Sequence, residues 1–421
     1  MTALDRLSGE RIFDISDLGR RGDGIATLDG KTLYVPYALP GETVRAEVSG
    51  DRAGLLEVVT PSAHRVAPPC RHFTVCGGCA VQHLDDASYR DWKRGLVEAA
   101  LAHRGIDCAV DPLVDAHGRG RRRTTLHVSF ENGAAQAGFM EARSHRLLDL
   151  DACPILVPAL RDAPTIARAL ARPFAVRNKP LDIHLTATQT GIDCDIRGDG
   201  AGTRDIGLDV RRDLPGVARQ FDLARIAIAG ETIAAPRAPM VTVGPARVAS
   251  PPGAFLQATS AGEATLAALV QAHIGQADAV ADLFCGIGPF ALRLAQHAAI
   301  FAADSDKAAI AALDAAARHT SGLKPVTATV RDLFRNPLAA EELKPFDAVV
   351  FDPPRAGARA QAHELAGSNV TTIVAVSCDP ASFARDAATL IAGGYRLARL
   401  TPVDQFRHTP HVELVARFVR G

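Results

Sequence analysis

The chain has 421 residues, 47% of them hydrophobic and 22% charged, which is typical of a globular protein with two to four domains. It carries 47 basic and 47 acidic side chains, so its overall charge neither indicates nor excludes a nucleic-acid partner. Charges throughout residues 1–17 argue against a signal peptide, and no apolar run reaches membrane-spanning length. We therefore expect a cytoplasmic protein whose eight cysteines are metal ligands, catalytic thiols or packing residues and not disulfides.

Short alternating segments separated by glycine turns occupy the N-terminal region. They predict a small OB-like β-barrel over residues 1–62. Its strands are expected at 10–13, 24–28, 31–35, 42–48 and 55–59. Barrels of this kind often bind single-stranded nucleic acid, although the same architecture also serves unrelated functions.

The next segment, residues 63–245, is predicted to be a central α+β domain. It begins with a cysteine-rich loop and a helix near 88–104, which we expect to pack on the C-terminal domain. Strands are expected near 124–130, 183–188 and 191–196.

Four cysteines of this segment suit a four-thiolate metal site. Cys70, Cys76 and Cys79 share a short glycine-containing loop, and the distant Cys153 precedes a proline. Thiolates in this arrangement bind either zinc or an iron–sulfur cluster. The spacing alone leaves both metals open.

Residues 246–421 alternate strands with helices, which predicts a doubly wound, mostly parallel sheet. We expect strands at 279–284, 300–304, 326–330, 348–351 and 370–376, and helices at 359–367 and 381–392. The last two strands, 395–402 and 412–420, have only a loop between them. They should form a terminal hairpin that gives the sheet one antiparallel strand.

Cys378 lies between a predicted strand and a predicted helix. Asp379 is the expected N-cap of that helix and Pro380 its first residue, so the thiol lies at the carboxyl edge of the sheet. Open α/β sheets bind ligands at this edge. The helix dipole there favours the thiolate, the nucleophilic form of cysteine. A buried structural cysteine is the alternative.

A glycine-rich loop follows the first strand of this sheet. Gly286 and Gly288 permit a tight turn and close approach of a nucleotide-like ligand, and Asp304 ends the next strand, where a carboxylate binds ribose hydroxyls. The pattern Gly286-x-Gly288-x-x-Ala291 also fits a dinucleotide fingerprint. The loop alone therefore does not choose between NAD and S-adenosylmethionine.

Four motifs in this order resemble the RNA uracil-C5 methyltransferases. They are Asp-Leu-Phe-Cys-Gly-Ile-Gly-Pro-Phe at 282–290, Asp-Pro-Pro-Arg-Ala-Gly at 352–357, Ser-Cys-Asp-Pro at 377–380 and His-Thr-Pro-His-Val-Glu at 408–413. The resemblance implies a Rossmann-like class I methyltransferase domain and an N-terminal TRAM barrel. It also implies methyl transfer from S-adenosylmethionine to C5 of a uridine, in 23S rRNA or alternatively in transfer RNA.

The resemblance further implies roles for individual residues. Cys378 would be the nucleophile that adds to C6 of the uracil, and Glu413 the general base that removes the C5 proton. The donor pocket would be lined by Gln257, Phe284, Asp304 and Asp352. Cys70, Cys76, Cys79 and Cys153 would hold a [4Fe–4S] cluster with a structural or RNA-holding role.

RNA is the expected partner, with no DNA and no membrane, and the protein is expected to be a monomer. Arginines bind phosphates and stack on unpaired bases, so we predict RNA contacts at Arg20, Arg21, Arg121, Arg122, Arg123, Arg143 and Arg146. Two readings of other classes compete with the methyltransferase. One is an NAD-dependent dehydrogenase that uses the glycine loop, and the other is a non-catalytic RNA-binding protein.

Overall fold

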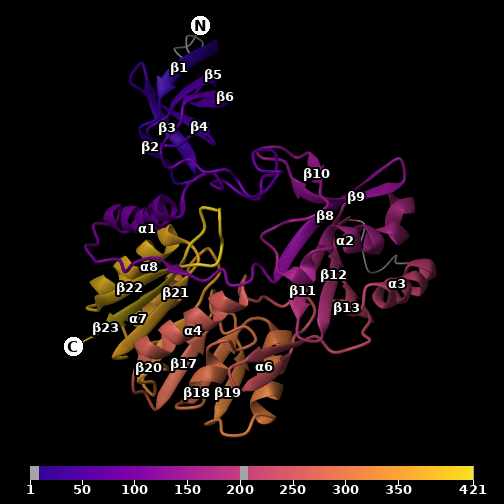
Figure 1. The fold of residues 1–421 in the computed structure, drawn as a ribbon. Coiled ribbons are helices and arrows are strands. Elements are labelled where there is room, and N and C mark those ends of the chain that lie inside the picture. The colour runs from indigo at the N-terminus through magenta and orange to yellow at the C-terminus, as the bar shows by residue number, and fades with distance from the viewer. Residues whose placement is uncertain (1–8, 200–206, 421) are drawn as a thin grey trace. The chain divides into compact units, whose positions relative to one another are not determined.

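The computed structural model describes residues 9–199 and 207–420 (Figure 1). Contacts within the chain divide it into two compact units. Unit 1 consists of Met1–Leu96, Phe139–Leu148 and Phe406–His411. Unit 2 consists of Val97–Gly138, Asp149–Gln405 and Val412–Gly421. The predicted domain boundaries at residues 62 and 245 remain predictions.

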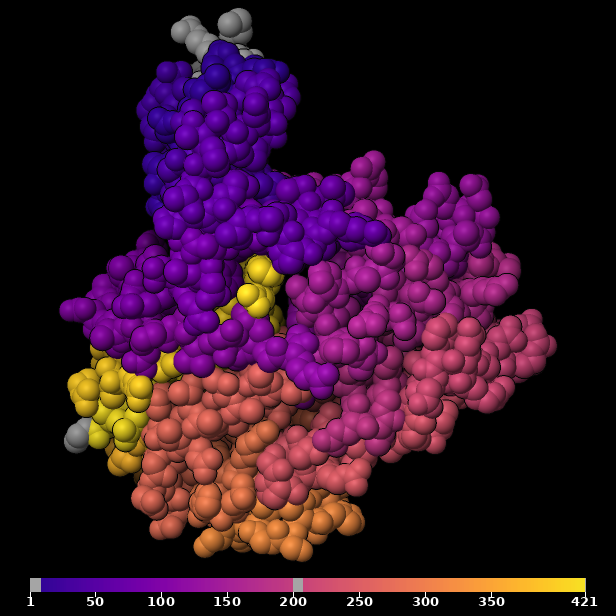
Figure 2. Space-filling view, in the orientation of Figure 1, coloured from indigo at the N-terminus to yellow at the C-terminus, as the bar shows by residue number. Residues whose placement is uncertain are grey.

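The N-terminal part of unit 1 is a curled six-stranded sheet with the strand order β1-β5-β6-β4-β3-β2. Its strands are β1 (Gly9–Asp14), β2 (Asp17–Leu18), β3 (Asp23–Leu28), β4 (Lys31–Pro36), β5 (Thr43–Ser49) and β6 (Arg52–Thr60). In β5 the buried Val44, Ala46 and Val48 alternate with outward polar residues, so one face of the sheet forms the core. The predicted OB-like barrel is confirmed, and its continuous stretch of chain is indigo in the space-filling view (Figure 2).

Unit 1 also contains the cysteine-rich loop and the start of helix α1 (Asp86–Ala102). The fully buried Lys93 of α1 donates through Nζ to the backbone oxygens of Phe406 (3.2 Å) and His411. The hydroxyl of Tyr89 accepts a hydrogen bond from the backbone of His408 at 3.0 Å. The 406–411 loop, which lies just before the predicted base, is therefore anchored by α1 within unit 1.

The central region of the chain contains a seven-stranded sheet with the order β10-β9-β8-β11-β12-β13-β14, most of which belongs to unit 2. Its strands are β8 (Arg123–Glu131), β9 (Ala134–Met140), β10 (Leu147–Asp149), β11 (Leu181–Thr188), β12 (Gly191–Arg197), β13 (Leu223–Ile228) and β14 (Glu231–Ala234). Helices α2 (Ala163–Ala171) and α3 (Leu208–Gln220) and two 3-10 helices, η2 (Pro158–Leu160) and η3 (Arg172–Arg177), accompany it. The three predicted strands are confirmed, whereas the other four strands and both α-helices were not predicted.

The C-terminal region of unit 2 is the predicted doubly wound sheet, with the order β19-β18-β17-β20-β21-β23-β22-β7. Its strands are β7 (Val114–Asp115), β17 (Ala279–Leu283), β18 (Ala299–Asp304), β19 (Val326–Val330), β20 (Ala348–Phe351), β21 (Thr372–Ser377), β22 (Arg396–Asp404) and β23 (Glu413–Val419). Its helices are α4 (Ser260–Ile274), α5 (Ala291–Leu294), α6 (Lys307–Arg318), α7 (Arg359–Ala366) and α8 (Pro380–Ala392). A hairpin of β15 (Met240–Val243) and β16 (Ala246–Ala249) precedes α4.

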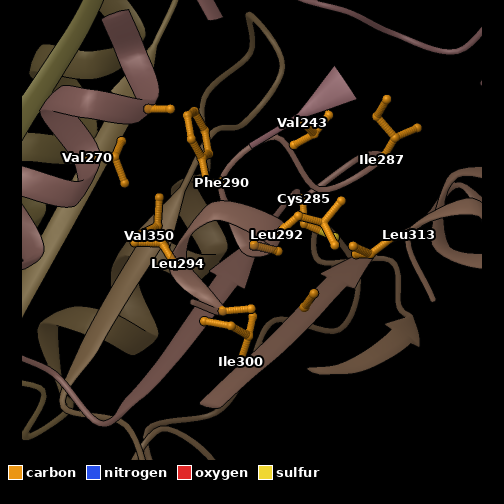
Figure 3. Close-up of a cluster of buried hydrophobic side chains, with 14 of the residues drawn as sticks. Val243, Val270, Cys285, Ile287, Phe290, Leu292, Leu294, Ile300, Leu313 and Val350 are labelled. Atoms are coloured by element: carbon orange, nitrogen blue, oxygen red, sulfur yellow. The ribbon is translucent and has the colours of Figure 1, made fainter. Parts of the chain in front are cut away.

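Alternate residues of the central strands enter two separate cores, one on each face of this sheet. Val350 belongs to the core that includes α4 and α6, while its neighbour Val349 belongs to the core that includes α7 and α8. Figure 3 shows the first core, with Val270 of α4 and Phe290 near the strand residue Val350. Val97 and Leu101, in the C-terminal half of α1, pack in the second core. Buried on both faces, the sheet is the middle of three layers.

The chain's last strand is antiparallel to both of its neighbours, β21 and β22. The predicted terminal hairpin is therefore confirmed. Strand β17 lies between β18 and β20, so the connections run in opposite directions from this point of the sheet. Ligands of doubly wound sheets bind at the carboxyl ends of strands at such a point. Four of the predicted site residues lie at the end of a strand of this sheet or directly after it: Phe284 (β17), Asp304 (β18), Asp352 (β20) and Cys378 (β21).

Candidate active site

Cys378 lies where the sequence places it, between β21 and α8. The carboxylate of Asp379 caps the helix by accepting hydrogen bonds from the backbone of Ala381 (3.0 Å) and Ser382 (2.9 Å). Burial is the largest of the effects that together raise the pKa of Cys378 to about 12, and the negative charges of Glu413, Asp352 and Asp379 contribute the smaller part. These effects outweigh the dipole of the helix.

Glu413 begins β23, the strand next to β21. Ser377 pairs with Leu414, so the two residues that flank this pair, Cys378 and Glu413, lie at the same end of adjacent strands. Glu413 is 3% exposed, and its Oε1 accepts a hydrogen bond of 3.0 Å from Nε2 of Gln405. The structure thus brings the predicted nucleophile and the predicted base together.

Two further predicted residues lie in the same hydrogen-bonded network. Nε2 of Gln257 donates to Oδ2 of Asp352 at 3.1 Å, and Oε1 of Gln257 accepts from Nε2 of Gln405 at 2.6 Å. Gln405 was missed in the sequence because a single glutamine at the end of a strand carries no motif. Its position directly after β22, beside the strand that begins with Glu413, was the available signal.

The glycine loop has the predicted conformation. Gly286 and Gly288 have φ angles of 53° and 85°, which favour glycine. A Cβ on Gly288 would stand 2.4 Å from Leu313, so this glycine allows α6 to pack closely. No atom outside the loop's own neighbours lies within 4 Å of a Cβ built on Gly286, which leaves room for a ligand there. Asp304 accepts a hydrogen bond through each carboxylate oxygen, from the Gly286 amide at 2.9 Å and from the Asp306 amide at 2.8 Å.

Phe284 adopts a conformation that is uncommon for a residue other than glycine. Its φ is 61°, and its ring lies 5.4 Å from the ring of Phe334. Strained residues of this kind gather at ligand sites. Two aromatic rings therefore stand beside the glycine loop, and Phe334 is 48% exposed.

Two buried carboxyl groups have raised pKa values. Burial raises the pKa of Asp282 to about 8 and that of Asp352 to about 7. Oδ2 of Asp282 accepts from the backbone of Ala291 at 2.8 Å, whereas the buried Oδ1 has no hydrogen-bond partner among the residues that the structure describes. A cation bound beside these groups would favour their ionised forms. The site therefore suits a positively charged ligand such as a sulfonium.

We predict that the affinity for S-adenosylmethionine rises with pH. The ionised fraction of a group with a pKa near 7 grows about tenfold from about pH 6 to about pH 8. Titration calorimetry at both pH values should therefore give a Kd that falls on the order of tenfold for the cationic donor. S-adenosylhomocysteine, which lacks the sulfonium charge, and the Asp352→Asn variant with either ligand should show a smaller change. Equal pH dependence for both ligands would contradict the prediction.

The predicted RNA-binding arginines differ in their surroundings. Arg122 is 7% exposed and donates to Oε2 of Glu263 at 2.6 Å and to the backbone of Gln257 at 3.0 Å. The prediction that Arg122 binds RNA is therefore wrong, because its guanidinium is enclosed by protein. The guanidinium of Arg123 lies 4.6 Å from the ring of Phe255, and burial lowers its pKa to about 10.

Two further arginines that were predicted to bind RNA, Arg143 and Arg146, lie in unit 1. Arg143 forms an ion pair with Asp23, and Arg146 forms one with Glu141 at 2.8 Å. Arg146 keeps 77% of its side chain exposed. It therefore remains accessible to a phosphate, whereas Arg143 already has a carboxylate partner.

The four cysteines of the predicted cluster do not form a ready-made site in the structure. In the described residues, no group of three or more His, Cys, Asp or Glu side chains is placed to hold a metal ion. Cys70, Cys76 and Cys79 belong to unit 1, and Cys153 belongs to unit 2. Burial raises the pKa of Cys76, and the nearby Cys70 raises it further. Thiols with raised pKa values need a metal or another cation to be deprotonated at neutral pH.

Known proteins similar to this chain share its organisation. Residues 250–418 match the family described as tRNA (Uracil-5-)-methyltransferase, and residues 14–57 match the TRAM domain. An RNA methyltransferase of Brucella suis biovar 1 is 46% identical over 407 residues, 97% of each chain. A 23S rRNA (uracil(1939)-C(5))-methyltransferase of Halomonas elongata is 35% identical and covers 96% of this chain and 88% of its own.

A solved structure supports the fold. The tRNA (uracil-54, C5)-methyltransferase of Pyrococcus abyssi, in complex with S-adenosyl-L-homocysteine, matches with a TM-score of 0.72 at 22% identity and covers 97% of this chain and 100% of its own. The doubly wound sheet with its antiparallel last strand has the class I methyltransferase fold. The chain belongs to the RNA uracil-C5 methyltransferase family.

The described residues contain no helix that is long and apolar enough to span a membrane.

Proposed function

We propose that this protein methylates C5 of a uridine in 23S rRNA through a covalent bond between Cys378 and C6 of the base. The observation that carries the proposal is the placement of Cys378 and Glu413 at the same end of adjacent strands. The charge of Glu413 acts on the thiol, and Gln257 and Gln405 join Glu413 to Asp352. The proposed base and the proposed donor-binding carboxylate thus share one hydrogen-bonded network, and the proposed nucleophile lies beside the base.

The proposed reaction begins at the thiol. Cys378 loses its proton, and Sγ bonds to C6 of the uracil while the C5=C6 π electrons move toward C5 and O4. C5 then bonds to the methyl carbon, and the electrons of the broken carbon–sulfur bond stay on the donor's sulfur. Glu413 takes the C5 proton, the C–H electrons restore the C5=C6 double bond, and the C6–Sγ bond breaks with its electrons on sulfur. The proton on Glu413 later returns to the thiolate, so each turnover releases one proton.

The donor is proposed to bind at the glycine loop. When bound, S-adenosylmethionine supplies a methyl group on a cationic sulfur. Asp304 would accept hydrogen bonds from the ribose hydroxyls, since each carboxylate oxygen keeps a lone pair beyond its hydrogen bond to Gly286 or Asp306. Phe284 and Phe334 would enclose the adenine, and Gln257 and Asp352 would lie near the sulfonium. A positive charge beside Asp352 would offset the negative charge of the carboxylates that raise the pKa of Cys378, and would therefore lower this pKa.

Ribosomal RNA is the proposed substrate because the Halomonas elongata relative, named for 23S rRNA, matches nearly the full chain. Transfer RNA is the alternative, since the Pyrococcus abyssi protein with the same fold is named for it. Unit 1 contributes a TRAM-type barrel, which suits single-stranded RNA. The target uridine must leave its stack to expose C5 and C6, so we propose a loop uridine or a flipped one. The monomeric state and cytoplasmic location remain predictions.

Mapping of 5-methyluridine tests the proposed function. RNA from a strain that lacks this protein should lose one 5-methyluridine in 23S rRNA, and the purified protein with S-adenosylmethionine should restore it. Retention of every rRNA site with loss of a transfer-RNA site would select the alternative substrate. Binding of NAD without binding of S-adenosylmethionine would reject the methyltransferase activity.

A [4Fe–4S] cluster held by Cys70, Cys76, Cys79 and Cys153 is a separate proposal. Its support is chemical, because these four cysteines are partly exposed and three of them share one loop. We expect anaerobically purified protein to contain about four irons per chain and to show broad absorption in the visible range. Cys76→Ser should lose both signals. Stoichiometric zinc without iron would select the zinc site instead.

A further inference from the structure

We propose that Gln405 is a positioning residue that holds the general base Glu413 and joins it to the donor-binding pair Gln257 and Asp352. The inference rests on the proposed function, since it requires Glu413 to remove the C5 proton. Gln405 has no exposed surface and lies directly after β22. Val403 of β22 pairs with Glu413, and Gln405 follows two residues later. Gln405 therefore lies beside the proposed base at the end of the sheet.

The orientation of the Gln405 amide is fixed by its partners. Nε2 donates to Oε1 of Gln257 at 2.6 Å and to Oε1 of Glu413 at 3.0 Å. The amide oxygen accepts from the backbone N–H of Thr259 at 3.3 Å. A flipped amide would place its oxygen against a carboxylate and its nitrogen against an N–H donor. Only one orientation is therefore compatible with the site.

The same reasoning fixes the amide of Gln257. Its Nε2 donates to Asp352, so its oxygen is left to accept from Gln405. Two buried amides thus connect two carboxyl groups, with an N–H directed at each carboxyl. A change in the position of Asp352 or Gln257 would be transmitted to Glu413 through Gln405.

The surrounding chain leaves little freedom for Gln405. A Cβ on Gly262, in the first turn of α4, would stand 2.6 Å from the Gln405 amide oxygen and 2.9 Å from its Cβ. A side chain at position 262 would therefore overlap with Gln405, and glycine avoids this overlap because it has no Cβ. The side chain of Thr259 caps α4 by accepting a hydrogen bond from the backbone of Gly262 at 2.7 Å. The backbone N–H of the same residue donates to the side-chain amide of Gln405. The beginning of α4 and the end of β22 enclose the residue.

This arrangement has a chemical consequence at Glu413. A buried carboxylate is stabilised by each N–H directed at it, and a bond to a charged acceptor is stronger than one between neutral groups. The bond from Gln405 engages Oε1 and restricts rotation of the carboxyl group. Loss of this bond should slow removal of the C5 proton more than it slows methyl transfer, because Glu413 takes its proton only after the methyl group has moved.

The test compares Gln405→Met with the wild-type protein in single-turnover reactions with RNA and labelled S-adenosylmethionine. Methionine keeps the approximate volume of glutamine and removes both hydrogen-bonding groups. We expect elimination of the product to slow by about 10- to 100-fold, so that a methylated protein–RNA adduct accumulates. Methyl transfer and the donor Kd should change less than about threefold, because the bond between Gln257 and Asp352 remains.

A second variant and a control separate this role from a structural one. Gln405→Glu is isosteric, removes the N–H donor and should accumulate the same adduct. Gln361→Met is the matched control, because Gln361 is also fully buried and bonds to the backbone of Leu338 at 2.8 and 3.0 Å. It should lower the melting temperature without accumulating an adduct.

Turnover of both Gln405 variants within about threefold of wild type, without adduct, would overturn the proposal. Equal slowing of methyl transfer and elimination would do the same. The Glu413→Gln protein is assayed in parallel. If it traps no adduct, the proposed function fails; if it does and the Gln405 variants do not, only the role of Gln405 fails.

Discussion

Cys378→Ala should abolish RNA methylation, with a loss on the order of 10⁴-fold or more, because no other group in the site can add to C6 of the uracil. Donor affinity should remain within about twofold, since the contacts that we assign to the donor come from the glycine loop and Asp352. The rate is measured by transfer of a labelled methyl group to RNA, and the affinity by titration calorimetry. Retention of more than about a hundredth of the activity would contradict the nucleophile assignment.

Cys194→Ala provides the control for loss of a thiol. Cys194 is fully buried in β12 of the central sheet, and burial raises its pKa well above the usual range. Its removal should leave a small cavity and lower the melting temperature, but methylation should persist. A comparable loss of activity in both variants would mean that Cys378→Ala acts through stability and not through chemistry.

The raised pKa of Cys378 also bears on the order of events. With a pKa of about 12, the free protein holds this residue as a thiol at neutral pH. We therefore expect the thiolate to form only once RNA and donor are bound, when the carboxylates of Glu413 and Asp352 face a cationic sulfonium. The enzyme would then not expose a reactive thiolate in the absence of its substrates.

The C-terminal sheet was predictable because its strands are apolar and its helices carry clear start signals. Asp379 and Pro380 mark the start of α8, and the predicted strand 348–351 matches β20 in the structure. The central sheet was only partly predictable. Strand β13 is buried along its whole length, so it lacks the alternation that identifies a strand, and it pairs in parallel with β12.

The site was predicted by its motifs but not by its electrostatics. Gly286 and Asp304 have the geometry expected from their spacing. The pKa of Cys378 depends instead on Glu413 and Asp352, which are distant in sequence and meet only through the sheet register. The ion pair that encloses Arg122 with Glu263 likewise could not be predicted from the sequence. Nothing in a run of three consecutive arginines indicates which of them is buried.

Glu413→Gln should trap the covalent adduct between protein and methylated RNA. Glutamine keeps an oxygen that can accept the hydrogen bond from Gln405, so the network that includes Gln257 should persist while the basic group is lost. The C5 proton then has no acceptor, and the bond from Cys378 to C6 cannot break. We expect product release to slow by about 10²- to 10⁴-fold, which is the usual contribution of a positioned base.

The adduct should appear as a protein–RNA band that survives denaturation and carries the labelled methyl group. The double variant Cys378→Ala/Glu413→Gln should show no such band, because the linking sulfur is absent. S-adenosylhomocysteine in place of the donor should give no methylated adduct. A Glu413→Gln enzyme that releases 5-methyluridine at the wild-type rate would show that another group removes the C5 proton, since the carboxylate at the start of β23 is the only base that the proposed mechanism uses.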